Sequence, residues 1–212
     1  MPSPIDALRF VHSAILYESD RIDEEAAGAA RGDELTALAD DVAFFEELVL
    51  LHTKGEELGL FPALADVTPH IDETYLFDHE GERSTFAALR QAIDAEDLAS
   101  ARRAAAMLRQ EAHSHVEKEN TFILPLVAES FPPPEQGAMV GKILSTIPPE
   151  RMPAVVPWII ERVSPEEAEA YVTVLEGAMP PEVFSNAKDW IREGVSVEVW
   201  SDLSTRLPQL TG

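Results

Sequence analysis

Two stretches of the chain repeat the same arrangement of metal-binding side chains. His52 is followed four residues later by Glu56, and His115 is followed four residues later by Glu119. Residues four apart lie one turn apart on one helix face, so each pair can offer one imidazole nitrogen and one carboxylate oxygen together. In both stretches an acidic or amide residue follows the Glu, and a proline stands ten residues after the His. Two such pairs among only six histidines indicate a metal site.

The residues around these pairs predict four amphipathic helices. Their apolar positions recur in steps of three and four, which is the spacing of a helix face buried on one side. The four stretches cover residues 5–22, 38–56, 75–93 and 98–122. Strand signals are nearly absent and Pro125 is expected to break the fourth helix. We therefore predict an all-α fold, with an antiparallel up-down four-helix bundle over residues 1–128.

Each of the four expected helices carries a histidine on its apolar stripe. A single histidine in such a place is usually a core residue, and an unpaired carboxylate one turn away would be costly to bury. At about 1.5 Å per residue, all four histidines reach a similar depth, roughly 25–30 Å from the same end of the bundle. This convergence predicts one shared site. Its expected ligands are His12, His52, Glu56, His79, His115 and Glu119.

Six ligands are too many for one tetrahedral zinc ion, which takes four. They are enough for two ions that share carboxylate bridges, with positions left for water, an oxo group or a small ligand. Mixed nitrogen and oxygen ligation with open positions suits iron, and manganese is the next choice, whereas calcium and magnesium prefer oxygen shells. We expect two iron ions joined by an oxo or hydroxo bridge, with manganese or zinc as substitutes.

Four other residues have readings that stay open at this level. Tyr75, one turn before His79, is either a core tyrosine or a candidate catalytic residue, acting as a phenolate ligand or as a donor to a bound oxygen species. Glu82 is either a seventh metal ligand or an acceptor for an imidazole N–H. His70 and His113 lie off the stripes and are expected at the surface or behind the ligands.

Composition excludes several classes of function. The formal charge of −23 argues against a nucleic-acid partner and against anionic membranes. The chain has no cysteine, which rules out disulfides, thiolate catalysis and cysteine-ligated metals. Residues 1–6 show no signal-peptide pattern and no apolar run approaches membrane length, so a cytoplasmic location is expected.

The ordered motifs resemble the hemerythrin-like (HHE cation-binding) family over residues 5 to about 128. The resemblance rests on a lone His, a His-x-x-x-Glu run ending in Leu60-Phe61-Pro62, a mid-helix His, and a second His-x-x-x-Glu run ending in Leu124-Pro125. It implies a non-haem di-iron centre inside a four-helix bundle. By this resemblance the six residues above are the ligands, with Glu56 and Glu119 bridging the ions.

One departure from the family changes the expected function. Oxygen-carrying hemerythrins have a second His one turn before the residue that matches His79, and this chain has Tyr75 there. Tyrosine in this place moves the expectation from oxygen carriage toward redox chemistry on peroxide, O2 or NO, of a peroxidase-like, catalase-like or NO-handling kind. Whether turnover occurs stays open. The alternative is a metal- or oxygen-responsive sensor that signals to a protein partner.

Residues 129–212 are expected to form a C-terminal extension of shorter helices. They are similar to the segment that follows the bundle in hemerythrin-like proteins of actinobacteria and in plant iron-sensing ubiquitin ligases, but lack residues for zinc fingers. Ser164-Pro165-Glu166-Glu167 has the pattern of a helix start. The extension is rich in tryptophan and is expected to pack on the bundle or on a second copy in a homodimer.

Overall fold

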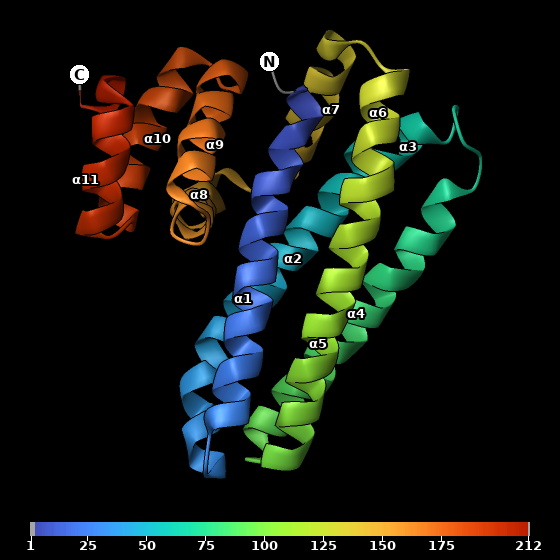
Figure 1. Ribbon diagram of the computed structural model, residues 1–212, viewed down its shortest axis with the longest axis vertical. Coiled ribbons are helices and arrows are strands. Elements are labelled where there is room, and N and C mark those ends of the chain that lie inside the picture. Colours follow the sequence, from blue (N-terminus) through green and yellow to red (C-terminus); the bar gives the residue numbers. More distant parts are fainter. Residues whose placement is uncertain (1–2, 212) are drawn as a thin grey trace.

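The computed structural model describes residues 3–211 and confirms the all-α prediction, because the described part of the chain contains helices and no strand. Four long helices run antiparallel to their chain neighbours and form a bundle (Figure 1). They are α1 (Leu8–Gly28), α2 (Ala39–Gly59), α4 (Ile71–Asp94) and α5 (Leu98–Lys118). Helix α5 packs against α1 and α4, and α2 packs against α4.

Short helical turns join these helices and fix where they begin. The 3-10 turns η1 (Pro4–Ala7) and η2 (Gly32–Leu38) lead into α1 and α2, and the short helix α3 (Phe61–Leu64) follows α2. The Asp97 side chain caps α5 by accepting hydrogen bonds from the backbone N–H groups of its first turn. The chain therefore reverses direction with little intervening loop, as the bundle prediction requires.

Two apolar clusters lie above and below a polar layer in the bundle. The larger one includes the touching rings of Phe45 and Phe86, and the smaller one includes Leu60 and Phe61 beyond the C-terminal end of α2. The buried histidines and glutamates of the bundle fall between these clusters along the helices. The site is thus shielded from water on both sides along the bundle axis.

The end of the fourth helix differs from the sequence prediction. Residues Glu119–Ile123 (η3) form a π-helical turn, and the helix continues as α6 (Leu124–Ser130). The prediction that Pro125 breaks the helix is wrong, because the proline occupies the first turn of α6, where its missing N–H is tolerated. Phe122 is the last residue of the fourth predicted apolar stripe and is expected to point inward. This prediction is also wrong. A π turn holds extra residues, so Ile123 is buried while Phe122 is 54% exposed.

The C-terminal helices pack on one side of the bundle (Figure 1). Helix α7 lies along α2, and α8 and α9 contact α1. The capping box predicted at Ser164 is confirmed at the start of α9. Trp158, Trp190 and Trp200 are partly buried against the larger apolar cluster. The helices are α7 (Pro133–Ser145), α8 (Met152–Ile160), α9 (Pro165–Ala178), α10 (Pro181–Gly194) and α11 (Val197–Arg206). Among residues 3–211, no helix is both long and apolar enough to cross a membrane.

Candidate metal centre

The structure brings all six predicted ligands into one buried layer. Their donor atoms form two groups, and within each group the atoms lie within 4.8 Å of one another. Both groups contain Glu56 and Glu119, and each adds a different pair of histidines. The first pair is His12 with His52, and the second is His79 with His115. Two histidine pairs thus share two carboxylates.

Each oxygen of Glu56 faces a different histidine pair. Its Oε1 lies 3.2 Å from Nε2 of His52 and 3.9 Å from Nε2 of His12. Its Oε2 lies 3.6 Å from Nε2 of His79. The carboxylate therefore spans the two groups.

The Glu119 carboxylate also spans the two groups, from the opposite helix. Its Oε2 lies 3.2 Å from Nε2 of His12, and its Oε1 lies 3.2 Å from Nε2 of His115. Within each pair the imidazole rings are close, with centroids 5.1 Å apart for His12 and His52 and 5.0 Å apart for His79 and His115. The two carboxylates thus stand between two imidazole pairs.

The donor atoms have the properties that a bound ion requires. The Nε2 atoms of the four histidines and all four carboxylate oxygens are buried, and none has a hydrogen-bond partner among the described residues. Unsatisfied buried polar atoms cost free energy, and eight of them converging on one space is not an ordinary core arrangement. Neutral imidazole nitrogens and carboxylate oxygens are the ligands that iron, manganese and zinc accept. The residues therefore fit the implied metal.

Side chains behind the histidines orient two of the rings. Nδ1 of His12 lies 2.9 Å from Oδ1 of Asn120, and Nδ1 of His79 lies 2.8 Å from Oε1 of Glu57. When Nδ1 carries the proton and donates to these acceptors, the lone pair of each ring is left on Nε2, which faces the site. Arg83 holds Glu57 in place with a 2.8 Å hydrogen bond from Nη2 to the same Oε1 atom.

The ring of His115 lies near a carboxylate but makes no hydrogen bond at Nδ1. Its Nδ1 lies 3.5 Å from Oδ2 of Asp78, which also pairs with Lys118. Asp78 directly precedes His79 in the chain. One turn of α4 therefore supplies both a predicted ligand and a carboxylate that lies beside another predicted ligand.

Sequence reasoning did not assign roles to Glu57 and Asn120, although a signal for them was present. Both are the acidic or amide residue that directly follows the Glu of a His-x-x-x-Glu run. Each Glu faces the buried His/Glu cluster, and the next residue supports a histidine on a neighbouring helix, His79 or His12. The repeated motif therefore encodes a ligand pair and an orienting acceptor.

In the metal-free site, the pKa values of the histidines show how the negative charges of the carboxylates are balanced. Burial lowers the pKa of His12, but Glu119 and Glu56 outweigh this and raise it to about 9. Burial also lowers the pKa of His115, but the Glu119 carboxylate outweighs this effect and the pKa rises to about 10. Burial lowers the pKa of His52 to about 4. Protons on His12 and His115 thus compensate two buried negative charges in the metal-free site.

Glu82 is not part of either His/Glu group, and Tyr75 lies beside the second group. The ring of Tyr75 packs edge-on against His115, with centroids 5.9 Å apart, and burial together with the Glu119 carboxylate raises its pKa to about 12. Glu82 lines a small cavity with His52 and His115, and burial raises its pKa to about 7. Both side chains are therefore placed to hold a proton near the site.

The two remaining histidines lie away from the buried layer. Nε2 of His113 pairs with Oδ1 of Asp20 at 2.9 Å on the half-exposed surface of the bundle. His70 is exposed and pairs with Glu73 at the start of α4. These positions agree with the prediction that both are surface residues.

The fold and the site define the class of this chain as an all-α bundle protein with a buried His/Glu cluster suited to metal. The chain is 29% identical, over 154 residues, to a protein named Zinc finger protein BRUTUS from Arabidopsis thaliana. The match covers 69% of this chain and 12% of the plant protein. No family model matches the chain, and no solved structure matches it. The similarity and the cluster together are consistent with the hemerythrin-like resemblance.

Proposed function

We propose that the chain is a non-haem di-iron protein of the hemerythrin-like kind, which binds or turns over a small redox ligand in its bundle. The observation that carries the proposal is the sharing of Glu56 and Glu119 by two histidine pairs. One ion would leave half of the histidine nitrogens without a partner. Two ions, each with two imidazoles and sharing both carboxylates, use all eight orphaned donor atoms.

The donor set and the coordination number favour iron over a closed zinc site. Two imidazoles and two shared carboxylates would not fill an octahedral shell, so a bound iron ion would have room for an outside ligand. A closed zinc site has no such opening. When bound, the iron pair supplies redox chemistry that the side chains alone lack.

The role of the chain is to hold the ions, exclude water and keep protons within reach. The apolar clusters on both sides of the layer lower the local dielectric constant. Tyr75 packs on His115, and its raised pKa keeps the phenol protonated, so we assign it as a proton donor to a bound ligand. Glu82, whose pKa lies near neutrality, is the second candidate to store a proton.

A sensor is the second candidate function, and one contact favours it. Ile143 of α7 packs directly against Gly55, the residue before Glu56. A change in the position of Glu56 on metal binding would therefore reach the C-terminal helices. Hydrogen exchange in α7 that differs between metal-loaded and stripped protein supports signalling, and identical exchange argues against it.

Metal analysis and optical spectroscopy test the main proposal. Protein purified from iron-replete cells is expected to contain about two iron ions per chain and to show visible absorption that changes when peroxide or NO is added. One zinc ion and no iron would contradict the proposal. Iron without any response to peroxide, O2 or NO would leave the sensor as the better account.

A further inference from the structure

A small apolar cavity extends to His52, one of the six predicted ligands. Its volume is about 60 Å³, and apart from His52 and Tyr171 its lining is aliphatic. A space of about 10–15 Å³ already admits a water-sized molecule, so this cavity has room for a diatomic gas. Its walls offer almost no hydrogen-bond partners, which makes it costly for ions and strongly hydrated molecules to enter.

The walls of this inner cavity are shared between the bundle and the C-terminal extension. Helices α1 and α2 supply one side, and α7, α8 and α9 supply the other. From α7 comes Ile143, and from α9 comes Leu175. The cavity therefore exists because the C-terminal helices pack on the bundle.

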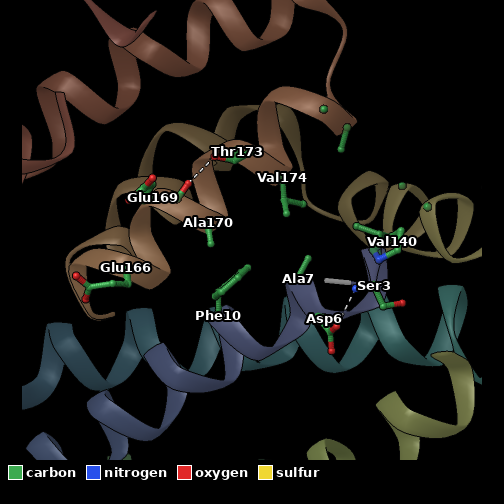
Figure 2. A pocket seen from close by; sticks show the side chains of 15 residues that line it. Ser3, Asp6, Ala7, Phe10, Val140, Glu166, Glu169, Ala170, Thr173 and Val174 are labelled. Atoms are coloured by element: carbon green, nitrogen blue, oxygen red, sulfur yellow. Dashed lines mark hydrogen bonds between the residues drawn. The ribbon is translucent and has the colours of Figure 1, made fainter. Parts of the chain in front are cut away.

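A larger cleft opens to solvent next to the inner cavity. Its volume is about 830 Å³, and it lies between the start of α1, α7 and α9 (Figure 2). The two spaces share Ala7, Val140 and Val174 in their linings. Figure 2 shows the Val174 side chain pointing from α9 toward Ala7. These three apolar side chains therefore lie where the cleft and the cavity beside His52 adjoin.

We propose that the C-terminal helices form an apolar entry route by which an uncharged diatomic gas reaches the metal centre, from the cleft past Val174 to His52. The inference rests on the proposed function and narrows its ligand to molecules such as O2 or NO. Ala7, Val140 and Val174 form the constriction of this route and act by size and polarity. It also gives the extension a role at the site.

A cavity on the other side of the site, beside His115, has the opposite character. It has a volume of about 300 Å³, and its lining around His115 includes Asp78, Gln110, Glu111 and Ser114. Polar and charged walls suit water and hydrogen peroxide, which keep their hydrogen bonds there. On the proposed route apolar gases approach on the side of His52, whereas the cavity beside His115 suits polar molecules.

A Val174→Trp variant of the full chain tests the route. Val174 is half-buried at the constriction, so an indole there can fill the passage from the side of the cleft. Thr173→Trp is the matched control, because Thr173 lines the cleft and not the inner cavity. Val174→Phe is a second, smaller block in case the tryptophan variant does not fold. Circular dichroism checks that each variant is folded.

Two measurements decide the outcome, and one does not require iron. Crystals of the wild-type chain under xenon pressure are expected to show xenon against Ile143 and Leu175. In stopped flow, NO is expected to bind the iron-loaded block variant at least about tenfold more slowly than the wild type or the control. Hydrogen peroxide is expected to react with all three at similar rates.

Three results would overturn the route. They are an inner cavity that takes up no xenon, equal NO rates in wild type and block variant, and peroxide slowed by the same factor as NO. Iron content is measured on the same samples. Its absence would refute the proposed function alone, since xenon occupancy does not depend on iron.

Discussion

Ile143 packs so closely against Gly55 that no other residue fits at position 55 without a shift. A Cβ atom added to Gly55 would lie 2.7 Å from Cγ2 of Ile143, and one added to Gly59 would lie 2.8 Å from Cγ1 of the same side chain. The two glycines let α7 approach the part of α2 that carries Glu56. The C-terminal extension therefore presses directly on the backbone beside a predicted bridging carboxylate.

We predict that Gly55→Ala weakens both folding and metal binding. Overpacking at such a contact costs about 1–3 kcal/mol, and each kcal/mol lowers the melting temperature of a chain this size by about 2–4 °C. The accompanying shift of α2 displaces Glu56, so metal content falls as well. Thermal melts and metal analysis measure the two effects. Gly141→Ala in α7, where an added Cβ meets nothing within 4 Å, is the control and should melt no lower than wild type.

We expect Glu56→Ala and Glu119→Ala to reduce metal content and thermal stability together. Either change removes a carboxylate that both histidine pairs share. Removing one partner from a buried charged network typically costs about 3–5 kcal/mol. Glu117→Gln, at an exposed position two residues before Glu119, should behave as wild type. Unchanged metal content in both alanine variants would show that these carboxylates are not ligands.

Replacing Glu57 by alanine tests the orienting acceptors. Its Oε1 atom accepts from both Nδ1 of His79 and Arg83. Loss of such an acceptor lowers metal affinity by about 10–100-fold without removing a ligand. Competition with a chelator measures the affinity. Arg83→Gln separates the two contacts, since it leaves Glu57 beside His79, and it should have a smaller effect than Glu57→Ala.

The stability of the metal-free protein should fall as the pH becomes alkaline. The pKa values of His12 and His115 rise from 6.5 to about 9 and about 10 in the folded chain. Their stabilising contribution is complete below pH 6.5 and is lost as the pH rises through these values.

Metal binding needs the same imidazoles neutral, so the metal-loaded protein should keep its stability over this range. The difference in melting temperature between loaded and stripped protein is therefore expected to grow from neutral pH toward pH 10. Paired thermal melts measure it, with His113→Gln as a surface control. A constant difference across the range would contradict the assignment of His12 and His115 as ligands.

Tyr75→Phe should leave metal content unchanged and slow the reaction with the small ligand. The raised pKa of Tyr75 keeps the phenol protonated, which favours a donor over a phenolate ligand. The visible spectrum of the resting ferric protein should therefore match that of the wild type. A charge-transfer band that disappears in the variant would show instead that the phenolate binds iron.

Residue patterns predict the extent and the inward faces of the helices only in part. The four helices and their inward faces follow from apolar spacing, a property of the local sequence. The continuation of the helix past Pro125 does not, because a π turn at Glu119–Ile123 depends on the packing that buries Ile123 and not Phe122. Local residue patterns therefore predict where helices form, whereas tertiary packing decides which residues of the π turn are buried.

The sequence by itself predicted which side chains form the candidate metal site, because helical periodicity places His12, His52, His79 and His115 on inward faces at one depth. Only the tertiary structure decided how these four histidines divide into two pairs. Sharing of Glu56 and Glu119 between two histidine pairs requires four helices to meet at defined distances. The route past Val174 likewise depends on how α7–α9 pack on α1 and α2, since a cavity is defined by side chains far apart in the chain.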